Sequence, residues 1–162
     1  TGNDIWRSIL GNNFPTGRGL SSFASLTKTP SQEIALNVGH RQKLGYPMQA
    51  PKPNATITAT VTLPSGETFD LPNDGPAIPK GSTVVYKVNC GPVKNGAVKW
   101  QVTNTGEEAM RICRRGGFEK PNAGKTSRRE ETAYTGKHYV QCFMIRKGAC
   151  VRWSNPFFIN VE

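Results

Sequence analysis

Histidine is scarce in this chain, which has only His40 and His138 among its 162 residues. Catalysis by a side-chain base or nucleophile needs positioned partners, and the sequence contains no nucleophile-elbow, Walker or Rossmann glycine pattern. Glu130 and Glu131 are adjacent, so in a strand they face opposite sides and cannot form a paired-carboxylate site alone. A metal-free hydrolase built on His138 and Glu131 is one alternative, but we expect a non-catalytic domain without a cofactor.

Closely spaced cysteine pairs are also absent. A zinc site needs paired ligands, and none of the four cysteines (Cys90, Cys113, Cys142 and Cys150) belongs to a CxxC pair. Two disulfides are compatible with the even number, but buried reduced thiols are favoured. Reduced thiols fit a cytoplasmic location.

Long apolar runs are missing as well, because no stretch approaches the ~20 residues that span a bilayer. The chain starts at Thr1 without an initiator Met or a signal-peptide pattern, which suggests a segment of a longer protein. A tether to the inner membrane in the full-length protein therefore stays an alternative.

Helical periodicity is rare, whereas short runs of Thr, Val and Ile alternate with a period of two. This pattern predicts an all-β domain, an Ig-like two-sheet β-sandwich of about seven strands. Trp100, on a central strand, is expected to anchor the core. The predicted strands are 55–63, 68–71, 82–88, 97–103, 132–145, 149–153 and 157–161.

The N-terminal third lacks this alternation. Residues 4–10 predict one short amphipathic helix that Asp4 can cap, and residues 16–53 predict an irregular extension that wraps the core. We therefore divide the chain into a helix with its extension, 1–53, and a β-sandwich domain, 54–162.

Acidic residues are few where basic ones gather. From Arg111 to Arg152 there are eleven Lys and Arg and three Glu, so this window carries +8 of the chain's net charge of +10. A field this concentrated suits phosphate, nucleic acid or an acidic membrane surface. A solvated basic face that only aids solubility is the alternative.

Within this window, the segment after Lys125 combines cations with an aromatic residue. Arg128 and Arg129 are forked donors suited to phosphate. If the following segment is extended, its alternate residues share one face, on which Tyr134 could stack on a base and His138 could hydrogen-bond phosphate or ribose. The candidate ligand-binding residues are Arg115, Lys125, Arg128, Arg129, Glu131, Thr132, Tyr134, Gly136 and His138.

The pattern Val98-Lys-Trp-Gln-Val-x-Asn-x-Gly106-x-x-Ala109, an Arg-Gly pair at residue 115, Arg-Glu-Glu-Thr-x-Tyr-x-Gly-x-His138 and a final Arg152 strand resembles the AGS-C domain. This is the adenylyl/guanylyl-cyclase and SMODS C-terminal sensor domain. The resemblance implies an all-β module of bacterial anti-phage signalling that binds a cyclic di- or oligonucleotide. It also implies a linked nucleotidyltransferase or membrane effector as partner.

Three other readings stay open. The same basic patch could bind RNA or DNA directly, which would give a steep salt dependence. The domain could be an Ig-like interaction module, or a regulatory lid that contacts only its own synthase. A homo-oligomer is compatible with each of them.

Overall fold

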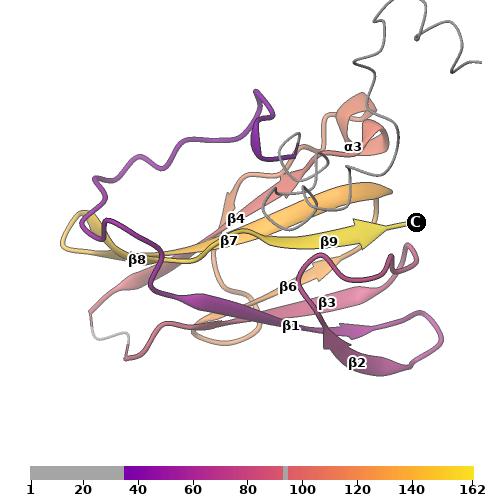
Figure 1. Cartoon of the computed structure of the whole chain (residues 1–162), viewed down its shortest axis with the longest axis horizontal. Helices are drawn as coiled ribbons and strands as arrows, with labels where there is room; N and C mark the ends of the chain where they lie inside the picture. Colours follow the sequence, from indigo (N-terminus) through magenta and orange to yellow (C-terminus); the bar gives the residue numbers. More distant parts are fainter. Residues whose placement is uncertain (1–34, 93–94) are drawn as a thin grey trace, which may run out of the picture. The chain divides into compact units, whose positions relative to one another are not determined.

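The computed structural model describes residues 35–92 and 95–162, which form two facing antiparallel sheets (Figure 1). The helix predicted at residues 4–10 lies outside the described residues. The first sheet has the order β2-β1-β3-β6, from Thr68–Leu71, Thr56–Thr62, Thr83–Asn89 and Ser127–Glu131. The second has the order β5-β4-β7-β8, from Phe118–Glu119, Ala97–Asn104, Gly136–Arg146 and Ala149–Trp153, and β9 (Phe157–Val161) pairs with β7. A short helix, α3 (Glu107–Arg111), follows β4.

The predicted two-sheet all-β fold is confirmed, with nine strands in the described residues where we expected about seven. The difference lies in the basic segment. Residues 127–131, expected to be part of a loop, form strand β6 and pair with β3. The strand predicted from Thr132 begins only at Gly136, because the chain turns between the two sheets at residues 132–135.

The core lies between the sheets and follows the period-two alternation. Trp100 is fully buried there, as predicted, and its ring lies 6.1 Å from that of Tyr86, which also packs against Phe157. Burial of such large aromatic side chains supplies much of the apolar area that stabilises a domain of this size.

The outer face of the second sheet is also covered. Residues 35–53, the described part of the extension, run across it (dark purple in Figure 1). Ala35 packs against Tyr139 and Phe158, and the backbone oxygen of Gln42 accepts a 2.5 Å hydrogen bond from the Gln101 side chain. Strand β7 is therefore buried on both faces, which makes it a rigid support for the residues at its first turn.

All four cysteines are free thiols, of which Cys90, Cys142 and Cys150 are buried and Cys113 is exposed. None of the helices in the described parts of the chain has the length and apolar character needed to cross a membrane.

Candidate ligand-binding cleft

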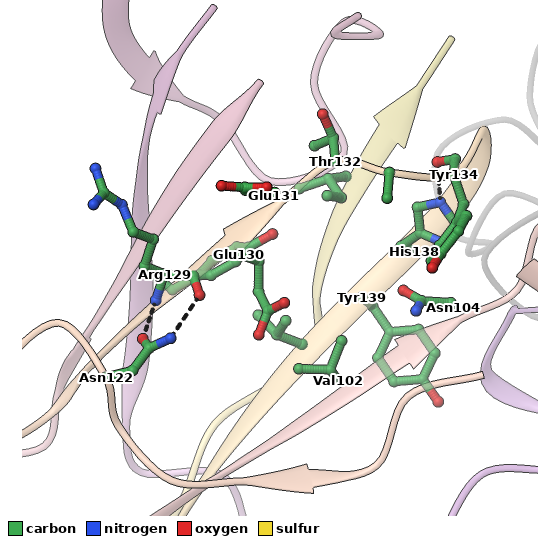
Figure 2. Close-up of a pocket in the computed structure, with 14 residues that line it drawn as sticks. Val102, Asn104, Asn122, Arg129, Glu130, Glu131, Thr132, Tyr134, His138 and Tyr139 are labelled. Atoms are coloured by element: carbon green, nitrogen blue, oxygen red, sulfur yellow. Dashed lines mark hydrogen bonds between the residues drawn. The ribbon is translucent and has the colours of Figure 1, made fainter. Parts of the chain in front are cut away.

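The two sheets separate along β6, and a cleft lies between this strand and β4 and β7 (Figure 2). The cleft consists of two adjoining hollows of about 440 and 430 Å³. Both are lined by Val102, Asn104, Glu130 and Tyr134, so they share one wall and one rim. Each volume lies in the ~300–1,000 Å³ range typical of small-molecule sites.

The crossover at residues 120–126, which carries the chain from β5 to β6, closes one end of the cleft. Its Asn122 side chain imitates a neighbouring strand: Nδ2 donates to the Arg129 backbone oxygen at 3.0 Å, and Oδ1 accepts from the Arg129 N–H at 2.6 Å. These bonds satisfy the outer edge of β6 without a further strand. No additional strand is therefore needed at this edge of β6, next to the cleft.

The register of β6 decides which charges face the cleft. Glu130 pairs with Val84 and Arg128 with Tyr86, and both partners are buried between the sheets. Arg128 and Glu130 therefore point inward, whereas Arg129 and Glu131 alternate to the outer face. Figure 2 shows the Arg129 and Glu131 side chains directed away from the centre of the cleft.

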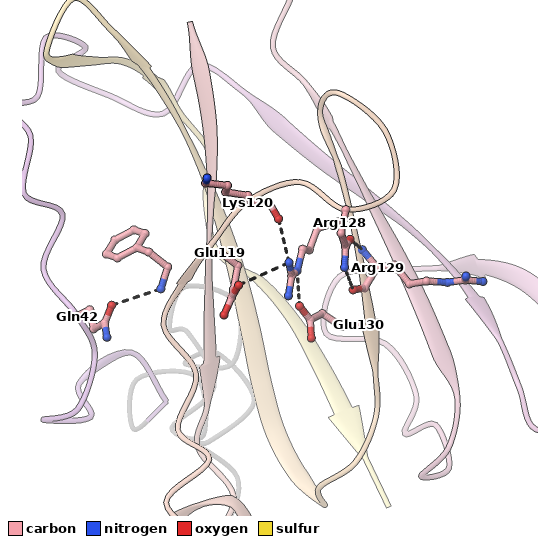
Figure 3. Close-up of polar contacts among 8 residues, drawn as sticks. Gln42, Glu119, Lys120, Arg128, Arg129 and Glu130 are labelled. Carbon is pink, nitrogen blue, oxygen red and sulfur yellow. Dashed lines mark hydrogen bonds and ion pairs between the residues drawn. The ribbon is translucent and has the colours of Figure 1, made fainter.

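Arg128 is committed to internal contacts. Its Nε donates to Glu130 Oε1, its Nη1 donates to the Lys120 backbone oxygen at 2.9 Å, and Nη1 lies 3.7 Å from Glu119 Oε2 (Figure 3). Its side chain is only 14 % exposed. The residue therefore ties the β5 side of the cleft to β6.

Glu130 lies in the wall that the two hollows share. Burial raises the pKa of its carboxyl above the ordinary 4.5, while the Arg128 guanidinium opposes that rise. Its negative charge also adds to burial in raising the pKa of the Tyr86 phenol. Among the hydrogen bonds of the described residues, Oε1 bonds Arg128 and Oε2 has no partner.

The opposite end of the cleft is held by His138, whose two ring nitrogens are both occupied. Nε2 donates to the Tyr134 backbone oxygen at 2.8 Å, and Nδ1 accepts the Thr105 N–H at 3.3 Å. These partners fix one neutral tautomer, and burial lowers the pKa of the imidazole below 6.5. His138 therefore holds the Tyr134 loop in place, and neither nitrogen is left for the predicted contact with phosphate or ribose.

Gly136 has a positive φ of 122°. A Cβ at this position would lie 2.7 Å from the Cα of Gly106, so the two backbones cross where no side chain fits. Gly136 was expected to allow a base or a backbone segment to approach closely, and the group that approaches it is the backbone of Gly106.

Thr132 also has an internal role. Its hydroxyl donates to the Pro79 backbone oxygen at 3.0 Å and accepts the Ser82 N–H at 2.9 Å. Because the chain turns at residues 132–135, before β7 begins at Gly136, the single extended face proposed for Thr132, Tyr134, Gly136 and His138 does not form.

Cations reach the cleft from the loop after α3. Asn104 binds this loop twice, through its backbone N–H to the Arg115 oxygen at 3.1 Å and through Nδ2 to the Arg114 oxygen at 2.9 Å. Arg114 and Arg115 are exposed and line the second hollow, so they form a basic lip. Lys125 lines neither hollow and lies instead beside a separate depression near Phe118.

The structure thus groups most of the predicted residues but changes their positions. Arg115, Arg128 and Tyr134 line the second hollow, and Arg129, Glu131, Thr132, Tyr134 and His138 line the first. Glu130 and Asn104 were not among the candidate ligand-binding residues predicted from the sequence. The alternation of β6 would have indicated Glu130, had residues 127–131 been recognised as a strand.

Residues 36–162 match the family described as the Adenylyl/Guanylyl and SMODS C-terminal sensor domain. The chain belongs to this family. The AGS-C match contains every residue of the cleft named above, and it begins in the extension that covers the second sheet. No curated protein matched the chain.

The described part of this AGS-C chain contains no group of three His, Cys, Asp or Glu side chains placed to hold a metal ion.

Proposed function

We propose that this AGS-C domain senses a nucleotide second messenger, a cyclic di- or oligonucleotide, that binds in the cleft between β6 and β4. One observation carries the proposal: Tyr134, Glu130 and Asn104 border both hollows, and Arg114 and Arg115 stand at the lip. A nucleotide needs this combination of a stacking surface, polar groups for the base edge and cations for phosphate.

The domain itself supplies binding and not catalysis in this proposal. Ligand binding in the cleft would signal to a linked nucleotidyltransferase or membrane effector, within bacterial anti-phage signalling. The family description supports this arrangement, because it places the domain at the C-terminus of synthase-type proteins as a sensor. A cytoplasmic setting, where such messengers are made, follows from the same proposal.

The test is calorimetric titration of the 162-residue chain with cyclic di- and trinucleotides, with linear nucleotides and short RNA as controls. The expected result is saturable one-site binding of a cyclic species. Affinity that rises with RNA length and falls steeply with salt would instead support the nucleic-acid alternative. Silence across the panel would overturn the sensor function.

Variants localise the site. Tyr134→Ala should weaken binding by about tenfold to a hundredfold through lost stacking, and Arg115→Ala by about tenfold through a lost phosphate contact. Phe69→Ala and Arg146→Ala are matched controls, because both residues are exposed and line neither hollow. Equal losses in the controls and the cleft variants would count against the site.

A further inference from the structure

Two unpaired acceptors lie in the wall that the hollows share. Glu130 Oε2 has no hydrogen bond among the described residues, and neither has Asn104 Oδ1, while the Asn104 Nδ2 donates one N–H to the Arg114 backbone oxygen. The cations lie at the lip, on exposed Arg114 and Arg115. A ligand that fits this arrangement has N–H donors on its inner end and negative charge on its outer end.

The four common bases differ in this respect. Guanine alone presents two adjacent donors on its Watson–Crick edge, the ring N1–H and the 2-amino group. Adenine and cytosine each place an amino donor beside a ring acceptor, and uracil has one donor between two carbonyl acceptors. A carboxylate has two acceptor oxygens and no proton to give, so it complements guanine and repels the ring acceptors of adenine and cytosine.

We propose, on the basis of the sensor function above, that the cleft selects guanine nucleotides and that Glu130 accepts hydrogen bonds from N1–H and the 2-amino group. Tyr134 stacks on the base, and Arg114 and Arg115 bind phosphate. Arg128 is a positioning residue: its Nε bond to Oε1 keeps the Glu130 carboxylate charged and in place, with Oε2 directed to the ligand.

The neighbourhood of Glu130 supports the same choice. The wall opposite the carboxylate includes Val102 and Val140, which offer apolar contact to a base but no competing donors. His138 offers none either, since its Nε2–H is held by the Tyr134 backbone oxygen. Neither these valines nor His138 therefore offers the ring nitrogen of adenine a donor beside the Glu130 carboxylate.

The experiment measures affinities of the full chain for GMP, IMP, AMP, CMP and UMP and for cyclic di-GMP, di-IMP and di-AMP. Guanine ligands should bind at least about tenfold more tightly than their adenine counterparts. Inosine ligands keep N1–H but lack the 2-amino group, so they should fall between. Tighter binding of adenine or pyrimidine ligands would overturn the guanine proposal and leave the sensor function standing, whereas no binding by any nucleotide would overturn both.

Glu130→Gln tests the residue directly. The variant retains an acceptor for Arg128 but replaces the second oxygen with an amino donor, which suits the adenine edge. Guanine ligands should lose at least about tenfold in affinity, while adenine ligands gain relative to them. Glu67→Gln, which removes the same charge from an exposed turn, should leave both affinities unchanged. An equal loss for guanine and adenine ligands, or no loss, would overturn the role of Glu130.

Discussion

The two ends of the cleft are closed by different kinds of interaction. At the β5 end, one guanidinium, that of Arg128, contacts Glu130, Glu119 and a backbone oxygen. At the β7 end, the closure is neutral: Gly106 and Gly136 cross in backbone contact, and His138 joins Thr105 to the Tyr134 oxygen. One end depends on charge and the other on shape and a neutral imidazole.

This difference assigns separate tasks to the two ends. A charged bridge can exchange partners when a ligand arrives, because each carboxylate retains acceptor capacity. A backbone crossing has no alternative arrangement of similar energy. We infer that the β7 end sets the position of Tyr134, whereas the β5 end can respond to what Glu130 binds.

The steric closure should give the largest effect on stability. Gly136→Ala places a Cβ against the Gly106 backbone at a φ of 122°, so we expect a loss of about 3 kcal/mol in the free energy of unfolding. Urea denaturation measures it. Gly124→Ala is the matched control, because Gly124 has a φ of 118° but nothing within 4 Å of the added Cβ. Equal losses in the two variants would show that the backbone angle, and not the crossing, is what matters.

Disrupting the charged closure should give the second-largest loss in the free energy of unfolding. Arg128→Ala leaves Glu130 and the Lys120 oxygen without their donor, which should cost about 2 kcal/mol. Arg129→Ala removes the same side chain from the outer face of the same strand and should change stability by less than about 0.5 kcal/mol. Chemical denaturation of both variants decides the matter, and similar values would contradict the inward assignment of Arg128.

The same strand shows how far sequence reasoning reached. The alternation in residues 55–63, 82–88 and 97–103 predicted strands and a sandwich, and the buried Trp100 followed from it. Strand β6 was not predicted because both of its faces carry charged residues, so hydrophobic periodicity gives no signal there. Without that strand, nothing distinguished Arg129 from Arg128, and Glu131 was predicted as a ligand-binding residue in place of Glu130.

The hydrogen-bond partners of His138 and Thr132 could not be predicted from the sequence either. His138 and Thr132 were predicted to face a ligand because their chemistry suits one. His138 also bonds Thr105, and Thr132 bonds Pro79, and these partners are 33 and 53 residues away in the chain. Such partners depend on how the two sheets pack, which local pattern does not encode.

The neutral closure should respond to acid. The folded pKa of His138 is lowered by burial, so the unfolded chain binds more protons; stability is full above about 6.5 and falls as the pH drops through the folded pKa. Glu130 acts in the opposite sense, because its raised pKa gives a contribution that is lost as the pH rises. We therefore expect Glu130→Gln to steepen the acid loss and His138→Gln to flatten it, in denaturation curves from pH 7 to 5. Curves that stay parallel in both variants would contradict the neutral imidazole.

The smallest effect should come from a cation that lies near the charged end without taking part in it. Lys125 is on the crossover between β5 and β6 but lines neither hollow, and its side chain is exposed. Lys125→Ala should change the free energy of unfolding by less than about 0.5 kcal/mol and nucleotide affinity by less than about twofold, since a remote exposed charge is screened by salt. Denaturation and titration of this variant beside Arg115→Ala separate net charge from position. A loss in Lys125→Ala as large as in Arg115→Ala would mean that the basic segment attracts anions as a whole, and that the lip has no special place in it.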